Sequence, residues 1–76
     1  MSKESTFPEY LKQLRESYHY KQAFVAAQLN ICRQTYSHYE TGRIRPSVPV
    51  LYNLAKLYGT SVESMLERME IESPKN

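Results

Sequence analysis

Two short helices in close succession are predicted by the stretch KQAFVAAQLNICRQTYSHYETGRIRPS, residues 21–47. The first helix spans residues 22–29 and the second about residues 33–40, because apolar side chains recur in each at helical spacing. Only residues 30–32 connect them, and so short a connection makes the helices cross steeply. This geometry is the helix-turn-helix, whose second helix can enter the major groove of DNA. Helix corners of this kind also occur in proteins that bind no DNA.

Another helix is predicted before this pair, over about residues 8–18. Thr6 and Glu9 have the spacing of a capping box at its start. Asn30 and Gly42 mark the ends of the two central helices, because asparagine and glycine tolerate the left-handed conformation that ends a helix.

Two more helices are predicted after a basic loop at residues 43–46. Ser47 caps the first of them and Ser61 caps the second, since a serine hydroxyl accepts a hydrogen bond from the first helical turn. No stretch alternates polar and apolar residues, so no strand is predicted. The fold class is therefore all-α, with five helices. The expected organisation is an N-terminal arm (1–7), a compact domain (8–69) and a flexible C-terminal tail (70–76).

The composition restricts the class of protein. The chain has 76 residues, of which 41% are hydrophobic and 24% are charged, as in one small globular domain. One cysteine allows no internal disulfide, and no apolar run approaches the roughly 20 residues of a membrane span. The chain has no aspartate and only two histidines, which predicts neither a metal site nor a Ser-His-Asp triad. We therefore expect a cytoplasmic protein that is not an enzyme and uses no cofactor.

Charge is distributed unevenly along the chain. Residues 12–56 contain seven Lys or Arg and two Glu, a net charge of +5, whereas residues 57–76 contain four Glu and two Lys or Arg, a net charge of −2. A basic middle with an acidic end favours a surface that binds phosphates, with the acidic end turned away from them. The alternative is a mixed surface that is simply solvated.

The chain from Leu11 to Leu66 resembles the Cro/repressor-type helix-turn-helix, often called the Xre family. The matching residues are Leu14, Arg15, Gln22, Val25, Ala26, Leu29, Ile31, Thr35, Tyr36, Ser37, Tyr39, Glu40, Gly42, Pro46, Ser47, Leu51, Leu54, Ala55, Ser61, Glu63 and Leu66. Lys21 and Cys32 depart from the pattern, because members usually have hydroxyl caps there. The resemblance implies a five-helix, lambda repressor-like domain that binds double-stranded DNA, commonly as a homodimer, and regulates transcription.

The resemblance also implies roles for individual residues. The positions that face base edges in this family hold Arg33, Gln34, Ser37 and His38. Arginine pairs bidentately with guanine, and glutamine pairs with adenine. Without the resemblance, these polar side chains would be interpreted as a solvated helix face. The implied contacts to DNA phosphates are Lys21, Gln22, Cys32, Thr41, Arg43 and Arg45.

Three residues are assigned structural roles. Glu40 and Arg15 are expected to form an ion pair that orients the first helix against the third, and Gly42 ends the third helix.

Cys32 has two interpretations. It is either a small residue tolerated near DNA or a redox sensor, because the pKa of a thiol falls at a helix N-terminus.

We therefore expect a small transcriptional regulator, most simply a repressor, that reads an inverted repeat through the third helix. Met65, Leu66, Met69 and Ile71 form either a dimer interface or part of the monomer's own core. The alternative function is an antitoxin or accessory module that binds a protein partner and binds DNA only secondarily.

Overall fold

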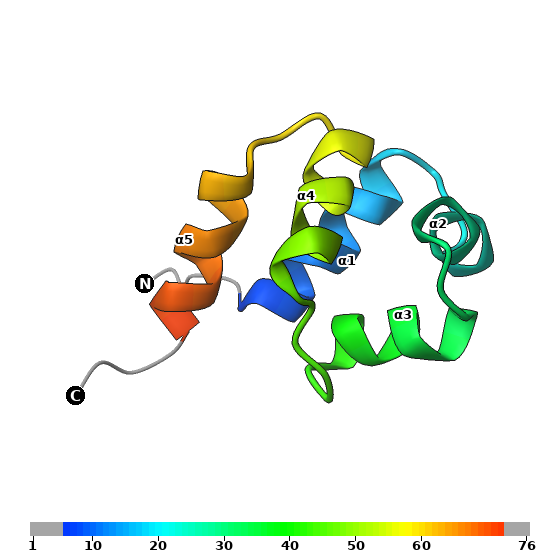
Figure 1. Cartoon of the computed structure of the whole chain (residues 1–76), viewed down its shortest axis with the longest axis horizontal. Coiled ribbons are helices and arrows are strands. Elements are labelled where there is room, and N and C mark those ends of the chain that lie inside the picture. The colour runs from blue at the N-terminus through cyan, green and yellow to red at the C-terminus, as the bar shows by residue number, and fades with distance from the viewer. Residues whose placement is uncertain (1–5, 73–76) are drawn as a thin grey trace.

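The computed structural model describes residues 6–72, and it describes side chains for residues 6–69. This part of the chain contains five helices and no strand, which confirms the all-α prediction (Figure 1). The helices are α1 (Phe7–Ser17), α2 (Gln22–Leu29), α3 (Arg33–Thr41), α4 (Val48–Leu57) and α5 (Val62–Glu72). None of them combines the length and the apolar character needed to cross a membrane.

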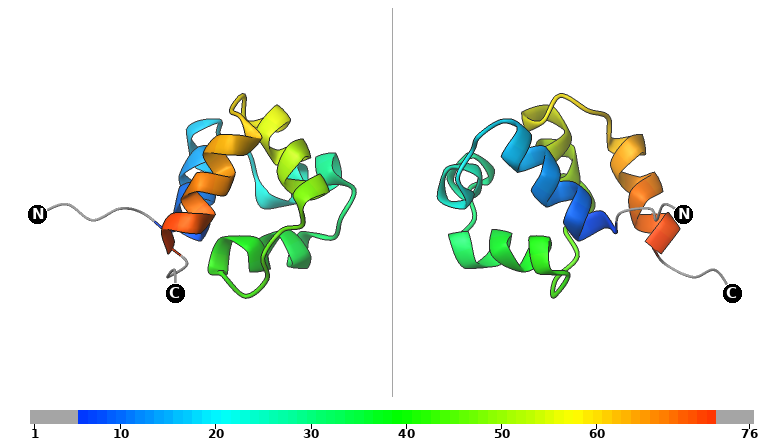
Figure 2. Two further views of the ribbon diagram at one scale, coloured as in Figure 1. Left: turned by 60° about the vertical axis from the view of Figure 1, so that its left-hand side comes forward. Right: turned by 180° about the vertical axis from the view of Figure 1, so that it is seen from behind.

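The five helices enclose a single core. α3 packs against α1 and α2, while α5 packs against α1 and α4 (Figure 1). α4 lies in front of α1 in Figure 1, and the view from behind in Figure 2 shows α1 in front. α3 runs along the bottom of the molecule in Figure 1, so one of its sides faces the core and the other faces outward.

Tyrosines fill much of this core. Tyr36, Tyr39 and Tyr58 are buried, as the apolar pattern predicts. The hydroxyl groups of Tyr36 and Tyr58 lie 2.9 Å apart and share a hydrogen bond, so neither buried phenol lacks a partner. The other buried hydrophobic residues are Phe7, Leu11, Val25, Ala26, Leu29, Leu51, Leu54, Ala55, Met65 and Met69.

The methionine stripe belongs mainly to the monomer. Met65 is fully buried and Met69 is 8% exposed, so both side chains are part of the chain's own core. Leu66, in contrast, lies on the outer side of α5. The side chain of Ile71 lies outside the described residues. Of the two roles expected for this stripe, Met65 and Met69 therefore take the one in the monomer's own core, and they leave almost no apolar surface for a dimer interface.

The first and last helices extend beyond residues 8–69 at both ends. α1 begins at Phe7, which was expected in the arm but is buried in the core. α5 continues to Glu72, three residues beyond the expected end at Met69. The remainder of the expected arm and tail, residues 1–5 and 73–76, lies outside the described residues.

The predicted caps of α1 and α5 are confirmed. The side chain of Thr6 accepts from Glu9 N at 3.4 Å, and Glu9 Oε1 accepts from Thr6 N at the same distance. Ser61 Oγ accepts a hydrogen bond from Ser64 N at 3.0 Å. The expected cap of α4 is wrong, since Ser47 occupies the N-cap position without a side-chain hydrogen bond to the helix.

Left-handed residues end both central helices, as the sequence predicts. Asn30 ends α2 at a φ of 62°, and Gly42 ends α3 at a φ of 84°. The turn at Asn30 leads almost directly into α3, so the two helices pack as a helix-turn-helix.

Candidate nucleic-acid interface

α3 has an outward face composed of polar side chains. Arg33 and Gln34 are exposed, while Ser37 and His38 are half-buried and lie four residues further along the same face. Thr41 is exposed one turn beyond Ser37. The structure therefore brings together on one side of one helix the four side chains expected to face base edges, and it places Thr41 at the end of this group.

The opposite side of α3 is anchored in the core by Tyr36, Tyr39 and Glu40. Three buried residues in two helical turns hold the helix by its inner side and leave the polar side free to meet a ligand. Rigid placement matters for reading bases, because a bidentate hydrogen bond requires an accurate position of the side chain.

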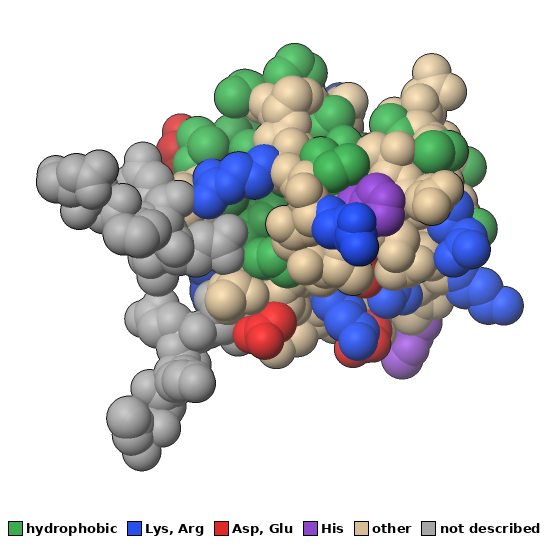
Figure 3. Space-filling view, turned by 90° about the horizontal axis from the view of Figure 1, so that it is seen from below, with side chains coloured by type: hydrophobic (Ala, Val, Ile, Leu, Met, Phe, Trp, Pro, Cys, Tyr) green, Lys and Arg blue, Asp and Glu red, His purple; other side chains and the backbone are tan. Residues whose placement is uncertain are grey.

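Positive charge surrounds this helix. Figure 3 views the molecule from the side of α3 and shows Lys and Arg side chains spread over that face. Arg43 and Arg45 lie exposed in the loop that follows α3, and Lys21 is exposed at the start of α2. Such a distribution of charge attracts a polyanion and is screened by salt.

The end of α3 determines where this basic loop begins. The carbonyl oxygen of His38 accepts hydrogen bonds from Gly42 N, from Arg43 N at 3.0 Å and from Thr41 Oγ1 at 3.2 Å. Because these bonds close the last turn, the chain leaves α3 in a defined direction, and the backbone of Arg43 is fixed to the last turn of the helix.

The N-termini of α2 and α3 lack side-chain caps. Lys21 and Cys32 occupy the two N-cap positions, and neither side chain makes a capping hydrogen bond to the backbone of its helix. Cys32 is exposed, its Sγ lies 3.1 Å from Thr35 Oγ1, and this hydrogen bond lowers the pKa of the thiol. Backbone N–H groups and the helix dipole at such termini favour an anion such as a phosphate.

Behind the outward face, Glu40 joins α1, α2 and α3. Its carboxylate accepts from Arg15 Nε at 2.7 Å, from Arg15 Nη2 at 3.1 Å and from Gln22 Nε2 at 3.0 Å. Arg15 also donates through Nη1 to the carbonyl oxygen of Tyr20 at 2.9 Å. The expected ion pair between Arg15 and Glu40 is confirmed, and its side chains are only 13% and 3% exposed.

The charged form of Glu40 is stabilised despite its burial. Burial raises the pKa of this carboxyl, but hydrogen bonds from Arg15, Tyr36 and Gln22 together outweigh that effect and leave the pKa lowered. Burial also raises the pKa of Tyr36, and it raises the pKa of Tyr58 to about 12. All three groups therefore keep one protonation state near neutral pH, and the support beneath α3 stays constant.

Gln22 has a partner that the sequence did not reveal. Its amide nitrogen donates to Glu40, 18 residues away, and this bond uses one of its two N–H groups. The amide is therefore held at the first turn of α2 by the same carboxylate that anchors α3. No local spacing signals such a contact, because it forms only when the two helices cross.

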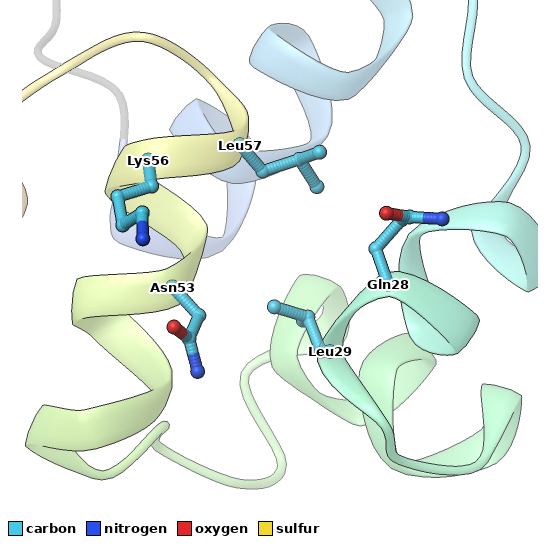
Figure 4. A pocket seen from close by; sticks show the side chains of 5 residues that line it. All are labelled: Gln28, Leu29, Asn53, Lys56 and Leu57. Atoms are coloured by element: carbon cyan, nitrogen blue, oxygen red, sulfur yellow. The ribbon is translucent and has the colours of Figure 1, made fainter.

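A separate hollow lies between α2 and α4, and it is lined by Gln28, Leu29, Asn53, Lys56 and Leu57 (Figure 4). In Figure 4 the Leu57 side chain extends from α4 toward Gln28, and the Leu29 side chain extends from α2 toward Asn53. The lining contains no carboxylate, imidazole or thiol. More widely, the described residues contain no group of His, Cys, Asp or Glu side chains placed to hold a metal ion.

Comparison with known proteins gives two matches. A family model described as helix-turn-helix matches residues 11–65. The chain is also similar to the HTH-type transcriptional regulator AnsR of Bacillus subtilis (strain 168), with 36% identity over 58 residues, or 76% of this chain and 50% of that protein. The chain thus spans about half the length of this relative.

Proposed function

Because the chain belongs to the helix-turn-helix family of the Cro/repressor type, we propose that it binds double-stranded DNA of a specific sequence and regulates transcription. The observation that carries this proposal is the two-sided character of α3. Its inner side is fixed by Tyr36, Tyr39 and Glu40, and its outer side presents polar side chains within a basic surface. Such a helix suits the major groove.

Base reading is assigned to Arg33 and Gln34 first, with Ser37 and His38 as shorter contacts. Arg33 and Gln34 are the exposed pair in the first turn of α3, and the N-terminal part of a recognition helix contacts base edges. A guanidinium binds guanine O6 and N7, and a carboxamide binds adenine N6 and N7. The operator half-site is therefore expected to contain a guanine next to an adenine.

Phosphate binding is assigned to side chains on both flanks of α3. Lys21, Gln22 and Cys32 lie at the uncapped N-termini of α2 and α3, where backbone N–H groups also point outward. Thr41, Arg43 and Arg45 follow the outward face on its other flank. Contacts on both flanks would fix the register of α3 in the groove without adding sequence information.

The DNA is proposed to be an inverted repeat bound by two chains, with recognition helices about 34 Å apart, one turn of the duplex. We assign a repressor role, in which the occupied operator excludes the transcription machinery. We also propose that the protein acts in the cytoplasm and has no enzymatic activity.

The test is selection of bound duplexes from a random pool at physiological salt, followed by sequencing. An enriched inverted repeat supports base reading by two chains, and a single enriched half-site supports base reading by one chain. If a folded protein enriches no sequence, DNA reading is excluded and the alternative of a protein-interaction module is favoured.

A further inference from the structure

The two helices that border the hollow carry almost no charge. The eight residues of α2 include no charged side chain, and the ten residues of α4 include one, Lys56. In the whole chain 24% of the residues are charged. Ala23, Phe24 and Ala27 are exposed, so α2 presents apolar side chains outward as well as toward the core. A helix at the surface normally carries polar and charged residues on its outer side, whereas depletion of charge is typical of the centre of a protein interface.

A series of aromatic rings leads from the end of α4 to the exposed side of α2. The ring of Tyr18 stacks on that of Tyr20 with 5.4 Å between centroids, and Tyr20 packs against Phe24 at 4.7 Å. Tyr18 and Phe24 are 41% and 44% exposed, while Tyr20 is half-buried. The hydroxyl of Tyr18 donates to the carbonyl oxygen of Tyr58 at 2.8 Å, and this bond holds the series at the C-terminus of α4.

The ring series and the hollow adjoin each other. Gln28, which lines the hollow, lies one turn beyond Phe24 on the same face of α2. Leu57 lines the hollow from α4 and directly precedes Tyr58, against which Tyr18 packs. Figure 4 shows the side chain of Leu57 extended from α4 toward Gln28. We call the three exposed or half-buried rings of this series and the hollow together the aromatic groove.

The hollow has room for a side chain rather than for a cofactor. Its volume is about 270 Å³, below the roughly 300–1,000 Å³ of pockets that enclose small molecules. The rings of Tyr18 and Phe24 extend the apolar surface beyond the hollow. An amphipathic helix suits such a surface, because its apolar side chains recur every three or four residues along one face.

The charge of the aromatic groove indicates the charge of its partner. Lys56 lines the hollow, and its Nζ lies 5.4 Å from the centre of the Tyr52 ring. Among residues 6–69, no carboxylate forms an ion pair with Lys56. We propose that the aromatic groove binds an amphipathic helix of another protein, which places an apolar side chain in the hollow and an aspartate or glutamate beside Lys56.

The aromatic groove lies away from the proposed DNA interface. In Figure 1, and from behind in Figure 2, the connection between α1 and α2 and the end of α4 lie at the top, whereas α3 runs along the bottom. A helix bound in the groove therefore leaves the outward face of α3 free, and the protein can hold partner and DNA together. The inference goes beyond the proposed function, and binding of the partner is measured without DNA.

The first experiment selects binders of the wild-type chain from a display library of helical peptides. The peptides are about 15 residues long, because shorter isolated helices are marginal in water. Each carries apolar residues at every third or fourth position along one face, and the other positions are random. We expect the selected peptides to place aspartate or glutamate next to the apolar stripe and to bind in the micromolar range. A library that yields no binder, or binders without an acidic preference, overturns the proposal.

Two variants test whether a selected peptide binds in the aromatic groove. Phe24→Ser removes an exposed ring and Lys56→Glu reverses the charge of the hollow, so each should weaken binding about tenfold or more in fluorescence anisotropy titrations. Ile44→Ser is the matched control for the ring, because Ile44 is 42% exposed in the loop after α3. Lys12→Glu is the control for charge, at an exposed position of α1. Both controls should bind as the wild type does, and circular dichroism establishes that all four variants are folded.

An exchange of charges separates a direct contact from a loss of structure. A selected peptide in which lysine replaces the acidic residue should bind Lys56→Glu more tightly than it binds the wild type. A variant that is merely misfolded cannot gain affinity in this way. The absence of this gain overturns the proposal, as does an equal loss of affinity in the two variants and their two controls.

DNA and self-association provide the last two comparisons. A selected peptide and a selected duplex should bind the wild type at the same time, and displacement of the peptide by the duplex would contradict the position of the groove. Sedimentation equilibrium without peptide tests for a second copy as the occupant, and self-association that Phe24→Ser abolishes would overturn the proposal. If the chain binds peptides as expected but selects no DNA, the proposed function is wrong and the aromatic groove stands.

Discussion

The guanidinium group of Arg15 in α1 donates hydrogen bonds to both carboxylate oxygens of Glu40 in α3, with N···O distances of 2.7 and 3.1 Å. The third nitrogen of the same group donates to the carbonyl oxygen of Tyr20, just before α2. One side chain therefore ties α1 and the entry to α2 to the inner side of α3. This contact fixes the rotation of α3 about its own axis. The orientation of the outward face, on the opposite side of α3, therefore depends on it.

Replacement of Arg15 by alanine should destabilise the protein severely. The substitution leaves Glu40 buried without its cation, and the loss of one partner from a buried ion pair costs about 3–5 kcal/mol. Urea denaturation followed by circular dichroism measures the change in the free energy of unfolding. Lys12→Ala removes an exposed cation from the same helix and should stay within about 0.5 kcal/mol of the wild type. If the two substitutions lower the free energy of unfolding equally, the ion pair between Arg15 and Glu40 does not stabilise the fold.

Acid should weaken the fold through Glu40. Its pKa in the folded chain is below the ordinary 4.5, so the unfolded chain takes up this proton more readily. The stabilisation is complete above pH 4.5 and is lost as the pH falls through the lower pKa of the folded state. Free energies of unfolding measured from pH 6 down to pH 3 should therefore decline more steeply for the wild type than for Glu40→Gln. If the two curves of unfolding free energy against pH run parallel, Glu40 does not contribute to the loss of stability in acid.

Substitution of Arg33 or Gln34 by alanine should reduce sequence discrimination. Each change should cost about 1–3 kcal/mol on the selected operator and almost nothing on random DNA, because a bidentate base contact is lost. Fluorescence anisotropy with both duplexes at one salt concentration measures the difference. Equal losses on the two duplexes would place these side chains on the phosphates instead.

Substitution of Arg43 by alanine should weaken binding to all sequences alike. Removal of one phosphate contact should lower the slope of log K against log salt by about one, since fewer counterions are released. Binding titrations over a range of salt concentrations give this slope. Lys12→Ala again provides a comparison, because it removes one positive charge on α1 without a proposed phosphate contact. If Arg43→Ala and Lys12→Ala change the slope equally, Arg43 acts only through the net charge.

Substitution of His19 by glycine should stabilise the fold. His19 has a φ of 59° in the turn after α1, and a left-handed conformation costs a residue with a Cβ about 1–2 kcal/mol. Glycine removes that cost but loses more entropy on folding, so we expect a net gain of about 0.5 kcal/mol. Asn30→Gly, at a φ of 62°, should gain less because asparagine tolerates this conformation. Thermal unfolding of the two variants compares these gains. A loss of stability in His19→Gly would contradict the claim that the left-handed backbone at His19 is strained.

Local patterns were sufficient to predict the helices. The limits of α2 and the capping box at Thr6 and Glu9 follow from residues a few positions apart in the chain. Gly42 and Asn30 end helices for a reason that is equally local, the energy of a left-handed backbone. The outward positions of α3 were also predictable, because Tyr36 and Tyr39 mark the inner side and the helical repeat then defines the outer one. The hydroxyl of Ser47 is an exception, since a suitable cap residue does not guarantee the cap hydrogen bond.

Contacts between helices depended on how the chain packs. The hydrogen bond from Gln22 to Glu40 and the pairing of the Tyr36 and Tyr58 hydroxyls join residues 18 and 22 positions apart. Met65 and Met69 fit a core or an interface equally well by periodicity, and only the position of α5 against α1 and α4 placed them in the core. The same packing left Val48 and Tyr52 uncovered on α4. Helical periodicity identifies the apolar side of each helix, but it does not show which neighbouring helix covers that side. The neighbouring helix is determined by side chains far apart in the sequence that bury surface together.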